Sequence, residues 1–234
     1  MKIAIMQPYI FPYIGYFQLI NAVDKFVVYD DGEYTKKGWI NRNRILMNGS
    51  DYLFSFPLKK DSDFQTIRNR LLADNYSEHK KKLIGRVSSA YAKSPQFKIV
   101  FPIVEECLNF ENNNLFLFIL NSLNKICCYL DIKTEFIISS VLNVNNSLKG
   151  EGKVIDINKK LNASTYINAI GGQALYSRET FSENNIKLMF IKTSEIVYPQ
   201  FSNEFVPNLS IIDVMMFNSK EKIQEYLRSF YTLI

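Results

Sequence analysis

The segment KIAIMQPYIFPYIGYFQLINAVDKFVVYDD, residues 2–31, decides the fold class of this chain. It holds two short apolar runs, at 3–6 and 26–30, with the helix-length segment YIGYFQLINAV between them. Apolar runs without alternation are typical of strands in a parallel sheet that is covered on both faces. Three more such runs follow at 135–140, 165–170 and 187–192. This alternation of strands with helix-length segments predicts an α/β fold, a Rossmann-like parallel sheet with right-handed crossovers.

Two regions interrupt the alternation. Residues 40–58 predict a β-hairpin, because Asn48-Gly49 at their centre is the strongest short signal for a hairpin turn. Residues 66–131 carry apolar side chains at helical spacing, with polar breaks between the segments. We therefore expect an all-helical insert, approximately 62–131, between the second and third strands. Because no internal repeat or low-complexity linker divides the chain, we expect one α/β domain over 1–234.

Composition limits the classes of function. The 234 residues include 28 Lys and Arg against 23 Asp and Glu, a net charge of +5. This mild excess suits an anionic small molecule, whereas nucleic-acid binding would need a basic stripe. Gln7, Pro8 and Pro12 cut the N-terminal apolar stretch, and no uninterrupted apolar run approaches the roughly 18 to 20 residues of a membrane span. We expect a cytoplasmic protein without a membrane span.

Histidine and cysteine usage narrows the chemistry further. His79 is the single histidine and lies in the charged run SEHKKK, so a Ser-His-Asp or Cys-His triad and histidine-ligated zinc are close to excluded. Cys107, Cys127 and Cys128 show neither metal-type spacing nor a disulfide framework. We expect them to be buried small apolar side chains in a reducing compartment. Acid–base chemistry would then fall to Asp, Glu, Lys or Tyr.

The ends of the first two strands form the first candidate site. In an open parallel sheet, ligands bind in the crevice beyond the carboxyl ends of the strands. Gln7-Pro8-Tyr9 follows the first strand, and Asp30-Asp31 follows the second. The loop after the first strand opens a helix whose N-terminal amides could hold an anion, and Gly15 permits close backbone approach. The alternative is an ordinary strand-to-helix turn with packed aromatic rings.

The next segment, 30–44, concentrates polar chemistry. It combines three carboxylates, two lysines, the single tryptophan, two asparagines and two arginines. On a hairpin strand Asn41 and Asn43 share one face, whereas Arg42 and Arg44 share the other. Guanidinium groups bind phosphate or carboxylate in a bidentate way. The alternative is a solvated, salt-bridged edge hairpin.

Later segments add weaker signals. Gly171-Gly172 ends the fourth strand, where a backbone could approach a ligand, although a simple tight turn fits as well. KGEGKVIDI, residues 149–157, places glycines at a helix start without P-loop spacing. Ser210 or Asn208 could cap the helix that contains IIDVMM. Asp213, a polar residue within that apolar run, either caps the helix or reaches the site.

The motifs resemble the WbqC-like family, which is associated with bacterial surface-polysaccharide (O-antigen) gene clusters. The resemblance rests on IMQPYIFPYIGYFQLI with VVYDDGEYTKKGWINRNRI, on YINAIGGQALY and on FVPNLSIIDVMM, and it covers nearly the whole chain. It implies a cytoplasmic enzyme of glycan precursor assembly. The motif positions it carries over are Gln7, Pro8, Tyr9, Gly15, Tyr16, Asp30, Asp31, Lys36, Trp39, Asn41, Arg42, Gly171, Gly172, Tyr176, Pro207, Ser210 and Asp213.

The opening strand, loop, helix and strand are also similar, more weakly, to HIGH-motif nucleotidyltransferases and to pantothenate synthetases. The similarity implies activation of a group with ATP. In this sequence Tyr13-Ile14-Gly15-Tyr16 stands where two histidines would flank the Ile-Gly pair. Tyrosine can donate to a phosphate oxygen but carries no positive charge, so this departure counts against adenylyl transfer.

The leading hypothesis is a transferase or ligase that N-acylates a nucleotide-linked amino sugar with an amino acid or another small acid. Predicted catalytic residues are Asp30, Asp31, Lys36 and Tyr16, with Asp30 or Asp31 as general base or magnesium ligand. Predicted substrate-binding residues are Gln7, Pro8, Tyr9, Tyr13, Gly15, Trp39, Asn41, Arg42, Arg44, Gly171, Gly172, Tyr176, Ser210 and Asp213. No residue is assigned to a resident metal, and ATP and magnesium are candidate cofactors.

The expected partners are a nucleotide sugar and an acyl donor. Aminoacyl-tRNA stays open as that donor, and no other nucleic acid is expected. A homodimer is expected on general frequency alone. The alternatives are a glycosyl- or nucleotidyltransferase of the same pathway and a non-catalytic sugar- or nucleotide-binding accessory protein.

Overall fold

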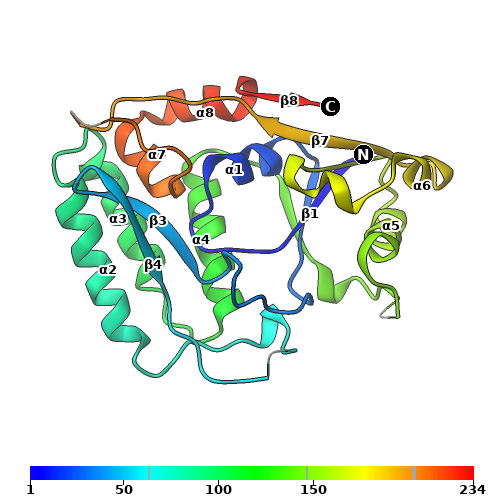
Figure 1. The fold of residues 1–234 in the computed structure, drawn as a ribbon, viewed down its shortest axis with the longest axis horizontal. Helices are drawn as coiled ribbons and strands as arrows, with labels where there is room; N and C mark the ends of the chain where they lie inside the picture. Colours follow the sequence, from blue (N-terminus) through cyan, green and yellow to red (C-terminus); the bar gives the residue numbers. More distant parts are fainter. Residues whose placement is uncertain (63, 146, 202–203) are drawn as a thin grey trace.

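The computed structural model describes residues 1–62, 64–145, 147–201 and 204–234. At its centre is a six-stranded sheet with the strand order β5-β2-β1-β6-β7-β8 (Figure 1). Its strands are β1 Lys2–Met6, β2 Lys25–Val28, β5 Glu135–Ile138, β6 Thr165–Ala169, β7 Lys187–Thr193 and β8 Tyr231–Leu233. Five strands pair in parallel, and β8 pairs antiparallel to β7. The predicted Rossmann-like α/β fold is confirmed, and β8 adds an edge strand to the five that the sequence indicates.

The strand order reverses beside β1. From β1 the chain adds β2 and then β5 on one side, after which it crosses over to add β6 and β7 on the other side. The loops that leave β1 and β6 at their carboxyl ends therefore lead in opposite directions. In doubly wound sheets this divergence opens a crevice, which is the usual place for a ligand.

Helices cover both faces of the sheet, as continuously apolar strands require. They are α1 Ile14–Asn21, α2 Tyr76–Tyr91, α3 Phe97–Leu108, α4 Leu115–Tyr129, α5 Gly150–Lys160, α6 Arg178–Glu183, α7 Ile211–Phe217 and α8 Lys220–Ser229. Ala4 and Phe26 belong to a buried cluster with α1, α4 and α8, whereas Ile3 and Val27 face a second cluster with α5 and α6. Figure 1 shows α5 and α6 together at one end of the molecule, away from α2, α3 and α4.

The hairpin and the helical insert both lie between β2 and β5. The hairpin strands are β3 Arg42–Met47 and β4 Ser50–Ser55, which form a separate two-stranded sheet. Its turn residues Asn48 and Gly49 have φ values of 52° and 77°, the positive values that a two-residue type I′ turn requires. Helices α2, α3 and α4 stand beside this hairpin as one lobe (Figure 1). The predicted hairpin is confirmed, and α2, α3 and α4 form the helical part of the insert predicted between the second and third strands.

Three local expectations are wrong. In the segment 66–73, expected as a helix, only the 3₁₀ turn η1 Ile67–Asn69 forms, because the chain there hydrogen-bonds alongside residues 30–34. Residues 139–140, expected at the end of a strand, open the 3₁₀ turn η2 Ser139–Val141. Cys128 is exposed, because neighbouring residues on a helix point about 100° apart and Cys127 faces the core.

No helix among the described residues has the length and apolar character needed to cross a membrane.

Candidate functional site

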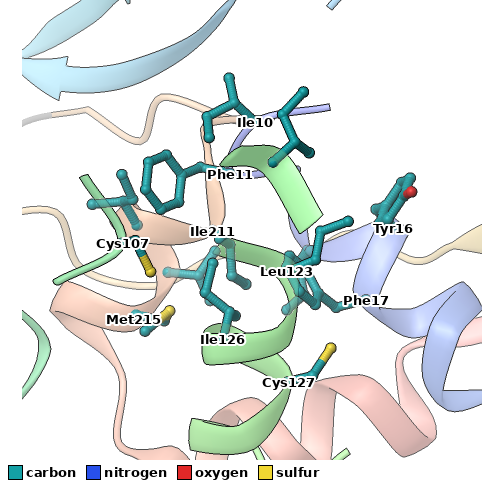
Figure 2. Close-up of a cluster of buried hydrophobic side chains, with 14 of the residues drawn as sticks. Ile10, Phe11, Tyr16, Phe17, Cys107, Leu123, Ile126, Cys127, Ile211 and Met215 are labelled. Atoms are coloured by element: carbon teal, nitrogen blue, oxygen red, sulfur yellow. The ribbon is translucent and has the colours of Figure 1, made fainter. Parts of the chain in front are cut away.

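The loop after β1 is anchored by a buried aromatic side chain. Phe11 is fully buried, and Figure 2 shows it within the cluster that also holds Cys107 and Ile211. Its backbone φ is 44°, a left-handed conformation that bulky residues rarely adopt. Such a conformation persists only where the surrounding structure holds it in place.

Two polar side chains from distant segments provide that hold. The Asn43 amide nitrogen donates to the carbonyl oxygens of Ile10 at 3.0 Å and Phe11 at 2.6 Å. The Ser210 hydroxyl donates to the same Phe11 carbonyl at 2.8 Å. Asn43 is 4% exposed and Ser210 is fully buried, so water does not compete for these bonds. The loop that presents Tyr9 and Tyr13 is therefore fixed from both β3 and α7.

This loop forms one wall of a groove beyond the carboxyl ends of the strands. One cavity of about 410 Å³ is lined by Tyr9, Tyr13, Trp39, Asn43, Arg44 and Asn208. An adjoining cavity of about 540 Å³ shares Tyr13 and Asn208 and extends along the segment 193–198 that follows β7. We call these two cavities together the Tyr13 groove. Volumes of this size are typical of small-molecule sites.

The groove combines a flat aromatic surface with cationic groups. The Trp39 side chain is 45% exposed, and the guanidinium carbons of Arg44 and Arg42 lie 5.4 Å and 5.6 Å from its ring centroid. Arg44 pairs with Asp51 at 3.2 Å, and its Nε is buried without an acceptor among the described residues. An exposed indole can stack on a planar ring, and a guanidinium can bind an oxyanion.

Gly15 gives the Tyr13 ring its place over the start of α1. A Cβ atom on Gly15 would lie 2.4 Å from Cζ and Oη of Tyr13, so a larger residue would displace that ring. Tyr16 is 3% exposed, its hydroxyl donates to the Gln7 carbonyl at 3.2 Å, and burial raises its pKa. The Tyr16 hydroxyl thus holds the protein backbone, and of these two tyrosines it is Tyr13 that lines the groove.

Asp30 is buried at the carboxyl end of β2 and is surrounded by donors. Its carboxylate accepts hydrogen bonds from the Ser139 hydroxyl at 2.9 Å, the Ser140 amide at 3.0 Å and the Ser140 hydroxyl at 2.8 Å. The Arg68 Nε lies 3.8 Å away. Asp30 is 1% exposed, so this network ties β2 to η2 and leaves the carboxylate little room to meet a ligand.

Asp31 forms the more accessible charged pair of the sheet edge. The Lys153 ammonium, from the first turns of α5, lies 2.6 Å from its carboxylate. Burial opposes ionisation of Asp31, but the hydrogen bonds from Lys153 and Ser139 outweigh it and lower the Asp31 pKa. Burial likewise opposes the charge on Lys153, but the bond to Asp31 outweighs it and raises the Lys153 pKa. Both groups are therefore ionised at neutral pH.

The Ser139 hydroxyl links the two carboxylates. It lies within hydrogen-bonding distance of Asp30 and of Asp31 and accepts a bond from the Asp30 amide at 3.2 Å. Because a hydroxyl has one proton, it donates to one carboxylate at a time. Gln7 reaches the same region, since its Nε2 would lie 3.4 Å from a Cβ on Gly32, the residue after Asp31.

The two glycines that follow β6 have different surroundings. A Cβ on Gly172 would lie 2.4 Å from Nδ2 of Asn168, so this position needs glycine for close packing. Gly171 is exposed, with no atom within 4 Å of a Cβ placed on it. Tyr176 packs its ring edge against Tyr166 at 5.7 Å, and burial raises its pKa.

Other predicted positions lie outside the groove. Asn41 accepts a hydrogen bond from the Tyr34 hydroxyl at 2.9 Å and, with Lys36, lines a separate cavity. Arg42 donates from Nε to the Gly38 carbonyl at 2.7 Å. Pro8 is buried in the loop after β1.

Asp213 is fully buried in the first turn of α7. Its carboxylate accepts hydrogen bonds from the hydroxyls of Tyr91 at 2.9 Å and Tyr198 at 2.7 Å and from Gln200 at 2.7 Å. Burial outweighs these bonds and raises its pKa. Tyr198 lines the Tyr13 groove, so Asp213 acts on that wall from behind. The predicted cap of α7 is Ser210, whose hydroxyl accepts from the Ile212 amide at 3.2 Å.

Sequence reasoning missed several residues of this region. Lys153 lies in KGEGKVIDI, whose glycines indicate only a helix start, and its pairing with Asp31 depends on the crossover between β5 and β6. The Ser139-Ser140 pair was assigned to a strand, although two hydroxyls after an apolar run are a signal of a site at the strand end. Asn208 entered only as a helix cap, and the structure places it in both cavities of the groove.

Comparison with known proteins identifies relatives over nearly the whole chain. The model of the WbqC-like protein family matches residues 7–225. The uncharacterized protein Rv1507c of Mycobacterium tuberculosis, strain H37Rv, is 30% identical over 234 residues, which is 97% of this chain and 97% of the relative. No solved structure matches the chain.

Proposed function

The chain belongs to the WbqC-like protein family, and from that premise we propose that it is an enzyme of bacterial surface-polysaccharide precursor synthesis. Within that role we propose that it is a transferase or ligase that forms an amide on a nucleotide-linked amino sugar. The acyl group is an amino acid or another small acid. ATP with magnesium is the proposed source of activation if the donor is a free acid.

The observation that carries this proposal is the Tyr13 groove at the carboxyl edge of a Rossmann-like sheet. It offers Trp39 and Tyr13 as ring surfaces, Arg44 as a phosphate-binding group and Asn208 as an amide. A nucleotide sugar needs all three kinds of contact, because it presents a planar base, a charged diphosphate and sugar hydroxyls. The absence of acidic residues in the first turn of α1, which opens beside the groove, also favours an anion there.

The charged pair of Asp31 and Lys153 is proposed to act on the acyl group. When an amine attacks an activated carbonyl, the carbonyl oxygen becomes negative, and a fixed ammonium stabilises that charge. Lys153 stays protonated at neutral pH and is held by Asp31, so it suits this role better than that of a nucleophile. Asp31, whose pKa is lowered, is a weak base, and we assign it to positioning Lys153. Asp30 and Tyr16 are positioning residues in this scheme.

Nucleotidyl transfer is the second candidate, and the strand order favours it because this order is common among nucleotide-binding sheets. Against it, the loop after β1 offers Tyr13 and a buried Tyr16, and neither carries positive charge. The product assay that tests the proposal therefore also measures the release of pyrophosphate.

The test is a product assay with the purified chain. Nucleotide-linked amino sugars are incubated with acyl-coenzyme A, with aminoacyl-tRNA, or with free amino acids and ATP plus magnesium, and the sugar is analysed by mass spectrometry. We expect the sugar to gain the mass of the acid minus that of one water, a product lost in Lys153→Met and reduced in Arg44→Met. Arg228→Met, which changes an exposed arginine on α8, is the matched control and should keep full turnover.

Binding of the nucleotide sugar without product from any donor would contradict the enzyme proposal and favour an accessory binding protein. Transfer of the sugar itself would show that the reaction is glycosyl transfer. Release of pyrophosphate without amide formation would show that it is nucleotidyl transfer.

A further inference from the structure

Another cavity lies beside the hairpin and has no part in the Tyr13 groove. Its volume is about 610 Å³. Its lining includes the cationic residues Lys36, Lys59, Lys60 and Arg70, against one carboxylate, that of Asp61. Neutral lining groups include the side chains of Tyr34 and Asn41. The described lining is therefore strongly biased towards positive charge.

Arg70 is the unusual member of this lining. It is 3% exposed, although a guanidinium stays protonated at any physiological pH. Its Nη2 donates to the Ser62 carbonyl at 2.6 Å, and its guanidinium carbon lies 4.7 Å from the Tyr34 ring centroid. Its Nε is buried without an acceptor in the described part of the chain. Among the residues that the structure describes, no carboxylate lies within ion-pair distance of Arg70.

Burial of a charge without a counterion is costly, and buried arginines are usually paired. The one carboxylate among the described lining residues does not meet this need. Asp61 accepts from the Ser62 amide at 2.7 Å and from the Gln65 side chain at 3.2 Å, which keeps it within its own loop. The Lys59 ammonium is held by Asp74 at 2.7 Å. The cavity therefore holds a fixed positive charge with an unused donor and lacks a matching anion from the described chain.

The backbone fixes Arg70 in place. The Leu115 amide, at the start of α4, donates to the Arg70 carbonyl at 2.9 Å, and the Arg70 amide donates to the Ile67 carbonyl at 3.2 Å. The Tyr34 hydroxyl donates to Asn41 at 2.9 Å, and Asn41 in turn donates to the Phe56 carbonyl at 2.7 Å. Arg70, Tyr34 and Asn41 are thus held in place on three separate segments of the lining, which lowers the ordering cost of binding.

We propose that this cavity is an anion-binding site in which Arg70 binds an oxyanion group, phosphate or carboxylate, of a small molecule. Arg70 supplies the charge and the free Nε donor, the Tyr34 ring supports the guanidinium from one face, and Lys60 adds long-range attraction from the rim. The site is distinct from the Tyr13 groove and does not depend on the proposed amide-forming reaction. It gives the protein a place for a second anionic ligand or for a second anionic part of a large one.

The test compares two probes, inorganic pyrophosphate and malonate, by isothermal titration calorimetry on the full chain. We expect saturable binding of at least one probe. Tighter binding of pyrophosphate would identify phosphate as the preferred group, and tighter binding of malonate would identify carboxylate. Arg70→Met should weaken that binding by about tenfold to hundredfold, the size of a lost charged hydrogen bond. Arg228→Met, which changes an exposed arginine on α8, should leave it unchanged.

A second readout does not depend on a variant that folds. An amine-acylating reagent modifies exposed lysines, and peptide mass spectrometry locates the adducts. The bound probe should protect Lys60, which is exposed at the rim of the cavity, and leave the modification of exposed Lys187 unchanged. Failure of both probes to bind, equal binding by Arg70→Met, or protection that does not include Lys60 would each overturn the proposal.

Discussion

Replacing Asn43 by alanine should loosen the loop after β1 and destabilise the whole fold. The side chain makes three buried contacts with the backbone, since its amide donates to Ile10 and Phe11 and its oxygen accepts from the Arg44 amide at 2.8 Å. Each buried group left without a partner costs about 1–3 kcal/mol, and the Phe11 carbonyl keeps its bond from Ser210. We therefore expect a loss of roughly 3 kcal/mol in the free energy of unfolding.

The measurement is thermal unfolding followed by circular dichroism, with urea unfolding as a second determination. For a chain of this length, a loss of roughly 3 kcal/mol lowers the Tm by about 6–12 °C. The matched control is Asn124→Ala on the exposed side of α4, where the change should stay within about 0.5 kcal/mol. Asn43→Asp should be worse than alanine, because a carboxylate would face two carbonyl oxygens and could donate to neither.

The double variant makes the reasoning stricter. Asn43 and Ser210 share the Phe11 carbonyl, so the costs of Asn43→Ala and Ser210→Ala should not add, and the double-mutant cycle should show coupling of about 0.5 kcal/mol or more. An Asn43→Ala protein as stable as the Asn124→Ala control, or two variants whose effects simply add, would show that these bonds do not hold the loop.

Three further outcomes follow from the structure. Gly15→Ala should keep or slightly raise the Tm, because alanine favours a helix by up to about 1 kcal/mol relative to glycine. It should nevertheless weaken ligand binding in the Tyr13 groove, because the new Cβ atom displaces the Tyr13 ring. Undiminished binding would contradict the argument that Gly15 sets the position of this ring. In the native protein a thiol reagent at pH 8 should modify Cys128 alone, since burial raises the pKa of the other two thiols to about 12, and denaturation should expose all three. The pKa of Asp31 in the folded protein lies below its usual value of 3.8, so ionised Asp31 stabilises the fold above pH 3.8, and this stabilisation is lost as the pH falls through the folded pKa. Asp31→Asn should therefore make the free energy of unfolding less dependent on pH in the acid range. An unchanged pH dependence would refute the pairing of Asp31 with Lys153.

The sequence predicts most of the sheet because the signal for a buried parallel strand is local. Each of the five apolar runs becomes a strand within two residues of its expected bounds. In β1, β2 and β6 the uninterrupted apolar run reflects burial on both faces. The hairpin was equally local, because Asn48-Gly49 determines the turn by itself. In contrast, β8 is short and lies at the edge, where one face and one side are free and the apolar pattern is weak.

The site was harder to predict because its contacts join distant segments. The sequence placed Asp30 and Asp31 at a strand end, as the structure does, but the partners that set their chemistry come from residues 139, 140 and 153. Charge and polarity alone made Asp30 as good a candidate as Asp31. Burial separates them, because Asp30 is enclosed by donors whereas Asp31 keeps part of its side chain open beside Lys153. No periodicity in the sequence carries that information.

Three of the four motif segments, residues 5–20, 27–45 and 205–216, meet at one point, the backbone of residues 10–12. The first segment supplies the loop, the second supplies Asn43 and the third supplies Ser210, and each of these two side chains ends on a loop carbonyl. Arg44, which follows Asn43, and Asn208, which lies two residues before Ser210, line the groove itself. A segment that must both hold the loop and contact the ligand is constrained at adjacent positions, which explains why polar and aromatic residues crowd together there. Variants of the holding residues should therefore lower stability and ligand binding together, whereas variants of Arg44 or Asn208 should lower binding at nearly constant stability.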